Sequence, residues 1–229
     1  MATRTETDSA RTLVLDVAGW PGHRPGQRLD LRLTAEDGYR AVRSYSIASA
    51  PGDSHVELTV QRTAGGEVSP YLVDVITPGD RCEVRGPIGG HFVWDPADPA
   101  PVALAAGGSG VVPLMAMIRT RARLGSDVPF RLLYAARSPA DVIYTAELER
   151  HSASGTGFDV TFAYSRRVPP GWPRSAGRVD RSVVASALWP PEFGPLCYVC
   201  GPTGFVERVA DLLVDGGHPP GRIRTERYG

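Results

Sequence analysis

The chain has 229 residues, 42% of them hydrophobic, and its 25 basic residues balance its 25 acidic ones. This length allows one large domain or two of about 100 to 150 residues, and the absence of a basic excess argues against a nucleic-acid partner. The first residues lack the apolar core of a signal peptide, and no run of about 18 apolar residues could span a bilayer. We therefore expect a cytoplasmic protein with no membrane span.

The first hundred residues have the pattern of short strands separated by turns. Apolar residues alternate with polar ones at Leu29 to Leu33 and at Val56 to Val60, Asp37-Gly38 is typical of a hairpin turn, and Cys82 to Val84 forms a further short strand. Closely spaced strands with glycine and proline turns predict a small antiparallel β-barrel.

One helix is expected to interrupt these strands. Ser69 has the side chain of an N-cap and Pro70 suits the first helical position. The start of this helix is a candidate anion site, because its first amides have no partner within the helix.

From Pro101 onward the pattern changes to strand and helix in alternation, which predicts a parallel sheet covered by helices on both faces. The segment DPADPAP at 95–101 is typical of a linker, so we expect domains at 1–97 and 98–229. The expected strands are 102–106, 130–135, 158–164, 196–200 and 222–225, and the expected helices are 113–124, 141–150, 183–188 and 205–214.

The three cysteines are too few for a disulfide framework or for a four-cysteine iron-sulfur cluster. Cys197 and Cys200 are spaced as a metal or redox pair would be, but they lie in an expected strand, where residues three apart face opposite sides. We interpret both as ordinary strand residues and expect no metal site.

A glycine-rich segment lies between the first strand and the first helix of the second half. Gly107, Gly108, Ser109 and Gly110 could let a pyrophosphate approach the helix start, with Pro113 in the first turn. The segment departs from the dinucleotide fingerprint of Rossmann folds, since Pro113 replaces the third glycine and no acidic residue follows the second strand. A glycine turn that merely packs a helix on a strand is the alternative.

A second group of anion-binding residues lies in the barrel half. Arg43 offers a fixed positive charge, Tyr45 offers an aromatic face, and the segment Gly65 to Ser69 leads into the expected helix. Each residue also has an ordinary structural explanation, as a solvated strand residue, a core residue or an N-cap.

Taken in order, five motifs resemble those of the ferredoxin-NADP reductase superfamily, especially of bacterial reductases that serve oxygenases. Nearly the whole chain is covered by this resemblance. The motifs are Arg43-Ser44-Tyr45-Ser46, Gly66-Glu67-Val68-Ser69, Gly86-Pro87-Ile88-Gly89-Gly90-His91-Phe92, Gly107 to Pro113, and Cys200-Gly201-Pro202.

The resemblance implies an FAD-binding barrel followed by an NAD(P)-binding domain. It implies that Arg43 binds the FAD pyrophosphate, that Tyr45 stacks on the isoalloxazine, and that Ser46 hydrogen-bonds near flavin N5. Gly66, Val68 and Ser69 would complete the pyrophosphate site. The family's first barrel strand is expected to be short or absent, because the chain starts late.

For the second half, the resemblance implies that the nicotinamide nucleotide lies on Gly107, Gly108, Ser109, Gly110 and Pro113, with Gly201 and Pro202 beside it. Cys200 would lie near the reacting nicotinamide carbon. Ser165 and Arg166 would take a 2′-phosphate, which favours NADPH over NADH, although NADH-using relatives carry similar pairs. Tyr228 would cover the flavin and gate hydride transfer; the alternative is a frayed terminus.

The expected function is an FAD-dependent NAD(P)H reductase. Without cysteines for an in-chain cluster, electrons would pass to a separate acceptor such as a ferredoxin, a haem or molybdenum protein, or free flavin. The first alternative is a free-flavin reductase, for which flavin is a substrate. The second is a non-catalytic flavin-binding subunit of a larger complex.

Overall fold

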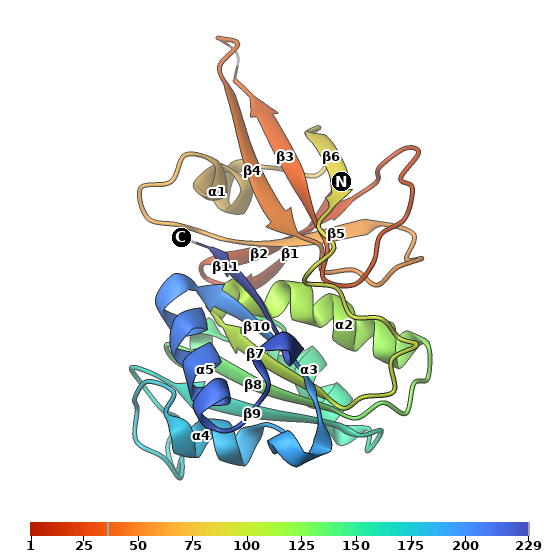
Figure 1. Cartoon of the computed structure of the whole chain (residues 1–229). Coiled ribbons are helices and arrows are strands. Elements are labelled where there is room, and N and C mark those ends of the chain that lie inside the picture. The colour runs from red at the N-terminus through yellow and green to blue at the C-terminus, as the bar shows by residue number, and fades with distance from the viewer. Residues whose placement is uncertain (36, 229) are drawn as a thin grey trace.

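The computed structural model describes residues 1–35 and 37–228. It has two parts, an antiparallel N-terminal domain and a parallel α/β domain, which lie one above the other in Figure 1. Within the described residues, no helix is long and apolar enough to cross a membrane.

The N-terminal domain consists of two three-stranded antiparallel sheets, in the orders β1-β2-β5 and β4-β3-β6. Its buried aliphatic side chains form one core, which includes Leu29, Leu31 and Leu58, as the alternating pattern predicts. The strands are β1 (Ala2–Thr7), β2 (Ala10–Leu15), β3 (Arg28–Thr34), β4 (Arg40–Ser46), β5 (Val56–Gln61) and β6 (Glu83–Ile88).

Two expectations for this domain are wrong. The first fifteen residues form two paired strands, β1 and β2, so the barrel does not lack its first strand. The helix α1 (Val68–Pro70), which continues as a π-helical turn at Tyr71–Val75, has Glu67 rather than Ser69 at its N-cap position, without a side-chain cap. Ser69 is no N-cap because it lies inside the helix, one residue after Val68, and its hydroxyl accepts the Thr63 amide at 3.0 Å.

The C-terminal domain is a five-stranded parallel sheet in the order β11-β10-β7-β8-β9. Helices α2 and α3 pack on one face and α4 and α5 on the other, as the alternation predicts. The strands are β7 (Val102–Gly107), β8 (Phe130–Ala136), β9 (Phe158–Tyr164), β10 (Leu196–Pro202) and β11 (Ile223–Tyr228). The helices are α2 (Val111–Arg123), α3 (Thr145–Ala153), α4 (Arg181–Ala187) and α5 (Thr203–Asp215).

The boundary of α3 differs most from its predicted position at 141–150. A 3₁₀ turn at Pro139–Asp141 precedes it, and Tyr144 has a φ of +63°, in the left-handed region. A helix cannot run through a left-handed residue, so α3 starts at Thr145.

The two domains share buried side chains. The cluster between the sheet and α2 includes Ala10, Ala48 and Phe92 from the N-terminal domain or the segment that follows it. The relative position of the domains is therefore set by packing as well as by the connecting chain.

Candidate cofactor site

The candidate flavin face lies on β4. Arg43 is exposed, and its guanidinium donates a 2.8 Å hydrogen bond to the neighbouring Val42 carbonyl. Tyr45 is half-buried against the barrel core, and burial raises the pKa of its phenol to about 12 although Arg43 opposes the shift. Tyr45 is thus a neutral ring at physiological pH, beside a cation that is open to a ligand.

The turn before α1 is narrow and closed by its own polar groups. The Gly66 amide donates to the Thr63 carbonyl at 3.1 Å, and the Thr63 amide donates to the Ser69 hydroxyl at 3.0 Å. A Cβ on Gly66 would lie 3.2 Å from both acceptor oxygens. The Tyr39 hydroxyl donates to Glu67 at 3.2 Å and so ties this turn to the hairpin that begins β4. The turn is therefore fixed next to the strand that carries Arg43, whose guanidinium suits a pyrophosphate.

The glycine loop runs from the end of β7 through a 3₁₀ turn, Gly108–Gly110, into α2. Two of its glycines are required by packing: a Cβ on Gly107 would lie 2.8 Å from the Phe205 ring, and one on Gly110 would collide with the Cys200 carbonyl. These two glycines are therefore needed to pack α2 and α5 closely against the strands, which is compatible with a nucleotide binding at the same loop. Pro113 is buried in the first turn of α2, where its missing amide hydrogen costs no hydrogen bond.

Tyr228 lies against this glycine loop. Its hydroxyl donates to the Gly107 carbonyl at 2.7 Å and accepts the Gly110 amide at 3.2 Å, and it also bonds the Ser109 side chain. Burial raises the pKa of Tyr228 to about 12, so the hydroxyl keeps its proton. The Tyr228 hydroxyl is therefore hydrogen-bonded to polar groups of the glycine loop, where the sequence predicts that the nucleotide binds.

Residues from both domains meet beside Cys200. The Ser46 hydroxyl, at the end of β4, donates to the carboxylate of Glu226 on β11, and Glu226 is the register partner of Cys200. Burial, and then the charge of Glu226, raises the pKa of Cys200 well above its ordinary value, so it is a thiol and no nucleophilic thiolate.

Glu226 is the residue that sequence reasoning missed. Burial raises the pKa of its carboxyl group, while Arg28 and the Ser46 hydrogen bond oppose the shift. The sequence offered one signal, because Glu226 lies two residues before Tyr228 and so points to the same face of the strand.

The remaining predicted residues are spread along the carboxyl edge of the sheet. Gly201 is buried, with Phe205 2.8 Å from where its Cβ would be, and Pro202 is exposed ahead of α5. Ser165 and Arg166 are exposed after β9, two strands away from β7, and their amides bond the carbonyls of Ala136 and Arg137. The structure therefore does not bring Ser165 and Arg166 into the Cys200 cluster. Cys197 faces the side of the sheet opposite Cys200, as expected, and among the described residues no three His, Cys, Asp or Glu side chains form a metal-binding group.

Comparison with known proteins identifies both domains. Residues 9–94 match the oxidoreductase FAD-binding domain, and residues 104–211 match the oxidoreductase NAD-binding domain. The chain is 34% identical over 213 residues to ferredoxin-NADP reductase B of Sorangium cellulosum, covering 89% of this chain and 84% of that protein. The chain belongs to the ferredoxin-NADP reductase superfamily.

Members of the superfamily with longer chains are also similar. The glycine betaine monooxygenase reductase subunit of Pseudomonas aeruginosa is 32% identical over 210 residues, which is 90% of this chain and 56% of that protein. The chain spans little more than half the length of several curated relatives that it matches.

The fold agrees with that of a solved superfamily member. The FAD/NAD-binding domain of nitric oxide dioxygenase from Vibrio cholerae superposes with a TM-score of 0.87 at 26% identity, covering 99% of this chain and 95% of that one. The chain is thus an oxidoreductase module with FAD as one cofactor and NADH or NADPH as the other. The exposed guanidinium of Arg43 and the neutral ring of Tyr45 fit such a flavin dinucleotide.

Proposed function

We propose that the chain takes a hydride from NADPH or NADH onto bound FAD and delivers the electrons to a separate acceptor protein. The observation that supports this most is that Ser46 from one domain and Glu226 from the other meet beside Cys200, next to the glycine loop. FAD, when bound, accepts a hydride at its N5 atom.

In the FAD domain, Arg43 binds the pyrophosphate through its planar fork of donors. Ser69 and the backbone of Gly66 and Val68 complete that site, and the neutral ring of Tyr45 packs on the isoalloxazine. Ser46 holds its hydroxyl near N5, and Glu226 would accept, through that hydroxyl, the proton that N5 loses when the electrons pass to an acceptor.

In the nucleotide domain, which we assign to residues 98–229 after an FAD domain at 1–97, the loop Gly107 to Pro113 with Gly201 and Pro202 holds the nicotinamide nucleotide. Cys200 packs against the nicotinamide as an uncharged thiol, which keeps water away from the hydride path. Tyr228 leaves the loop when the nucleotide arrives. Exposed Ser165 and Arg166 bind a 2′-phosphate, which favours NADPH.

The acceptor is proposed to be a separate redox protein. Several similar proteins are named as reductase subunits or components of monooxygenases. A ferredoxin, a haem protein or a molybdenum protein would each accept electrons from a reduced flavin.

The test is anaerobic reduction of the purified protein. We expect a yellow protein whose flavin absorbance bleaches on addition of NADPH, and more slowly with NADH. A colourless protein that reduces added FMN would show a free-flavin reductase, and a yellow protein that neither nucleotide bleaches would contradict hydride transfer.

A further inference from the structure

Helix α2 connects the nucleotide loop with the strand that carries Ser46. It begins at Val111, directly after the loop, and Arg119 lies about 12 Å further along its axis. From there the Arg119 guanidinium donates to the carbonyl of Ala48, two residues after Ser46, at 3.0 Å. One rigid helix thus spans the two predicted cofactor sites.

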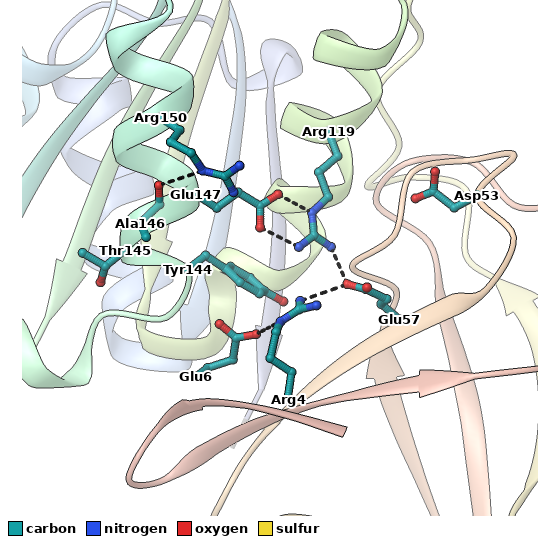
Figure 2. Close-up of a pocket in the computed structure, with 10 residues that line it drawn as sticks. All are labelled: Arg4, Glu6, Asp53, Glu57, Arg119, Tyr144, Thr145, Ala146, Glu147 and Arg150. Atoms are coloured by element: carbon teal, nitrogen blue, oxygen red, sulfur yellow. Dashed lines mark hydrogen bonds and ion pairs between the residues drawn. The ribbon is translucent and has the colours of Figure 1, made fainter. Parts of the chain in front are cut away.

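The guanidinium of Arg119 divides its hydrogen bonds between the domains (Figure 2). On the nucleotide-domain side, Nε and Nη2 each donate at 2.8 Å to the Glu147 carboxylate on α3. On the FAD-domain side, Nη1 donates to Glu57 on β5 at 2.8 Å and to Ala48. The Arg119 side chain is only 13% exposed, so this ion pair is shielded from water and differs from an ordinary surface pair.

Two neighbouring residues, Tyr144 and Arg123, make further contacts across the same junction. The Arg119 guanidinium lies 5.1 Å from the centre of the Tyr144 ring, and the Tyr144 hydroxyl is hydrogen-bonded to Thr59 on β5. The contacts of the Tyr144 side chain with Arg119 and Thr59 stabilise its left-handed backbone conformation. Arg123, one helical turn after Arg119, donates to the Gly52 carbonyl at 2.8 Å and pairs with Asp53.

The junction is distinct from the cofactor residues. A cleft of about 660 Å³ runs along it, and none of its lining residues belongs to the predicted FAD or nucleotide sites (Figure 2). The lining residues are Arg4, Glu6, Asp53, Glu57, Arg119, Tyr144, Thr145, Ala146, Glu147 and Arg150. An effect of Arg119 on the reaction would therefore act through geometry and not through contact with a reacting atom.

We propose that Arg119 is a positioning residue for hydride transfer, one that fixes the angle between α2 and the end of β4 and hence between nicotinamide and flavin. The inference rests on the proposed function. Hydride transfer is sensitive to such an angle, because a displacement of about 1 Å can cost on the order of 10²-fold in rate.

The test compares Arg119→Met with Arg181→Met in the FAD-loaded protein. Methionine retains much of the packing volume but removes all five donors. Arg181 is a matched control, since its 3.3 Å ion pair with Asp215 lies on the surface of the nucleotide domain alone. Anaerobic stopped-flow gives the limiting rate of flavin reduction and the nucleotide Kd separately.

For Arg119→Met we expect at least a tenfold lower limiting rate, with FAD content and nucleotide Kd unchanged. Arg181→Met should match the wild type. A second readout, free of activity, is amide hydrogen exchange in the apoprotein, which should increase in segment 48–57 for Arg119→Met only. An unchanged limiting rate, or a rate that falls only in proportion to lost FAD, would overturn the inference.

A second variant covers the case in which Arg119→Met does not fold. Glu57→Gln weakens only the FAD-domain side of the clamp, and it should lower the limiting rate in the same way without changing the Kd. If both variants fold, their double variant should be no slower than the slower single one, because both remove the same contact. If neither NADPH nor NADH reduces the wild type, the proposed function is wrong. If the wild type is reduced and the variants are reduced as fast, only the role of Arg119 is wrong.

Discussion

At the scale of single residues, the site depends on the pairing of Ser46 with Glu226. Ser46 comes from the FAD domain and Glu226 from the last strand of the nucleotide domain, next to Cys200. Burial keeps the pKa of Glu226 above its ordinary value, so its protonated form persists to higher pH than that of an exposed glutamate. A carboxyl group in this state can exchange a proton through the serine hydroxyl at a higher pH than an exposed glutamate can.

The first prediction is that Glu226→Gln lowers the rate at which an acceptor re-oxidises the reduced flavin by on the order of 10²-fold, the range typical of a lost proton-transfer group, because the hydrogen that N5 receives as hydride must leave it as a proton. In the wild type, the rate should depend on an ionisation above pH 4.5, and that ionisation should be missing from the variant. Stopped-flow rates across pH 4.5 to 9 measure both. A variant that retains the wild-type pH profile would remove Glu226 from the mechanism.

The second prediction is that Arg43→Ala weakens FAD binding by about 1.5 to 3 kcal/mol, the usual contribution of hydrogen bonds to a charged group. Arg40→Ala is the matched control, because residues three apart on β4 face opposite sides. Flavin fluorescence titration of the apoproteins gives both affinities. Equal losses for the two variants would indicate a general charge effect and no pyrophosphate contact.

At the scale of elements, the sequence predicts the type and order of the strands and helices of the second half and of several strands of the first, but not β1 and β2. Hydrophobic alternation and glycine turns carry this information locally, which is why β3, β5 and the βα units of the second half agree with their expected positions. Helix boundaries that depend on contacts between residues distant in sequence could not be predicted from these local patterns. The start of α3 depends on Tyr144, whose hydroxyl is hydrogen-bonded to Thr59 of the other domain. Ser69 is not at the N-cap position, and its hydroxyl instead accepts the Thr63 amide.

In the candidate site, too, local motifs could be predicted and contacts between distant residues could not. Motifs predict the glycine loop and the β4 residues, but the partner of Ser46 lies 180 positions along the chain, and only the fold brings Glu226 to it. Likewise, no local pattern indicates that Tyr228 bonds Gly107 and Gly110.

The third prediction belongs to this scale. Gly110→Ala should destabilise the protein by about 1 to 3 kcal/mol, because the new methyl group collides with the Cys200 carbonyl. Gly204→Ala, near the start of α5 with no atom within 4 Å of its Cβ position, should be neutral or stabilise by up to about 1 kcal/mol. Denaturant unfolding measures both changes. A Gly110→Ala protein as stable as the wild type would show that α2 is not packed tightly on β10.

At the scale of the whole molecule, two domains with separate sheets are joined by shared buried residues and by the Arg119 clamp. Burial raises the pKa of Glu147, but hydrogen bonds from Arg119 and His151 outweigh that effect and hold the pKa at about 2. A glutamate with a lowered pKa stabilises the fold above about pH 4.5, and the stabilisation is lost as the pH falls toward 2.

The fourth prediction is therefore an acid-sensitive junction. Between pH 4.5 and 2 the free energy of unfolding should fall by about 3 kcal/mol more in the wild type than in Glu147→Gln, since a shift of one pKa unit corresponds to about 1.4 kcal/mol. Denaturant unfolding at several pH values checks this. Parallel curves for the two proteins would mean that Glu147 is not held by Arg119 in solution.

Direct hydride transfer from the nicotinamide to the flavin would take place at the junction of the two domains. The decisive measurement is anaerobic stopped-flow reduction with NADPH that carries deuterium at nicotinamide C4. We expect one of the two C4-deuterated forms to slow flavin bleaching markedly and the other not to, because the site presents one face of the ring to N5. Equal bleaching rates with both deuterated forms and with unlabelled NADPH, or failure of both NADPH and NADH to bleach the bound flavin, would contradict direct hydride transfer.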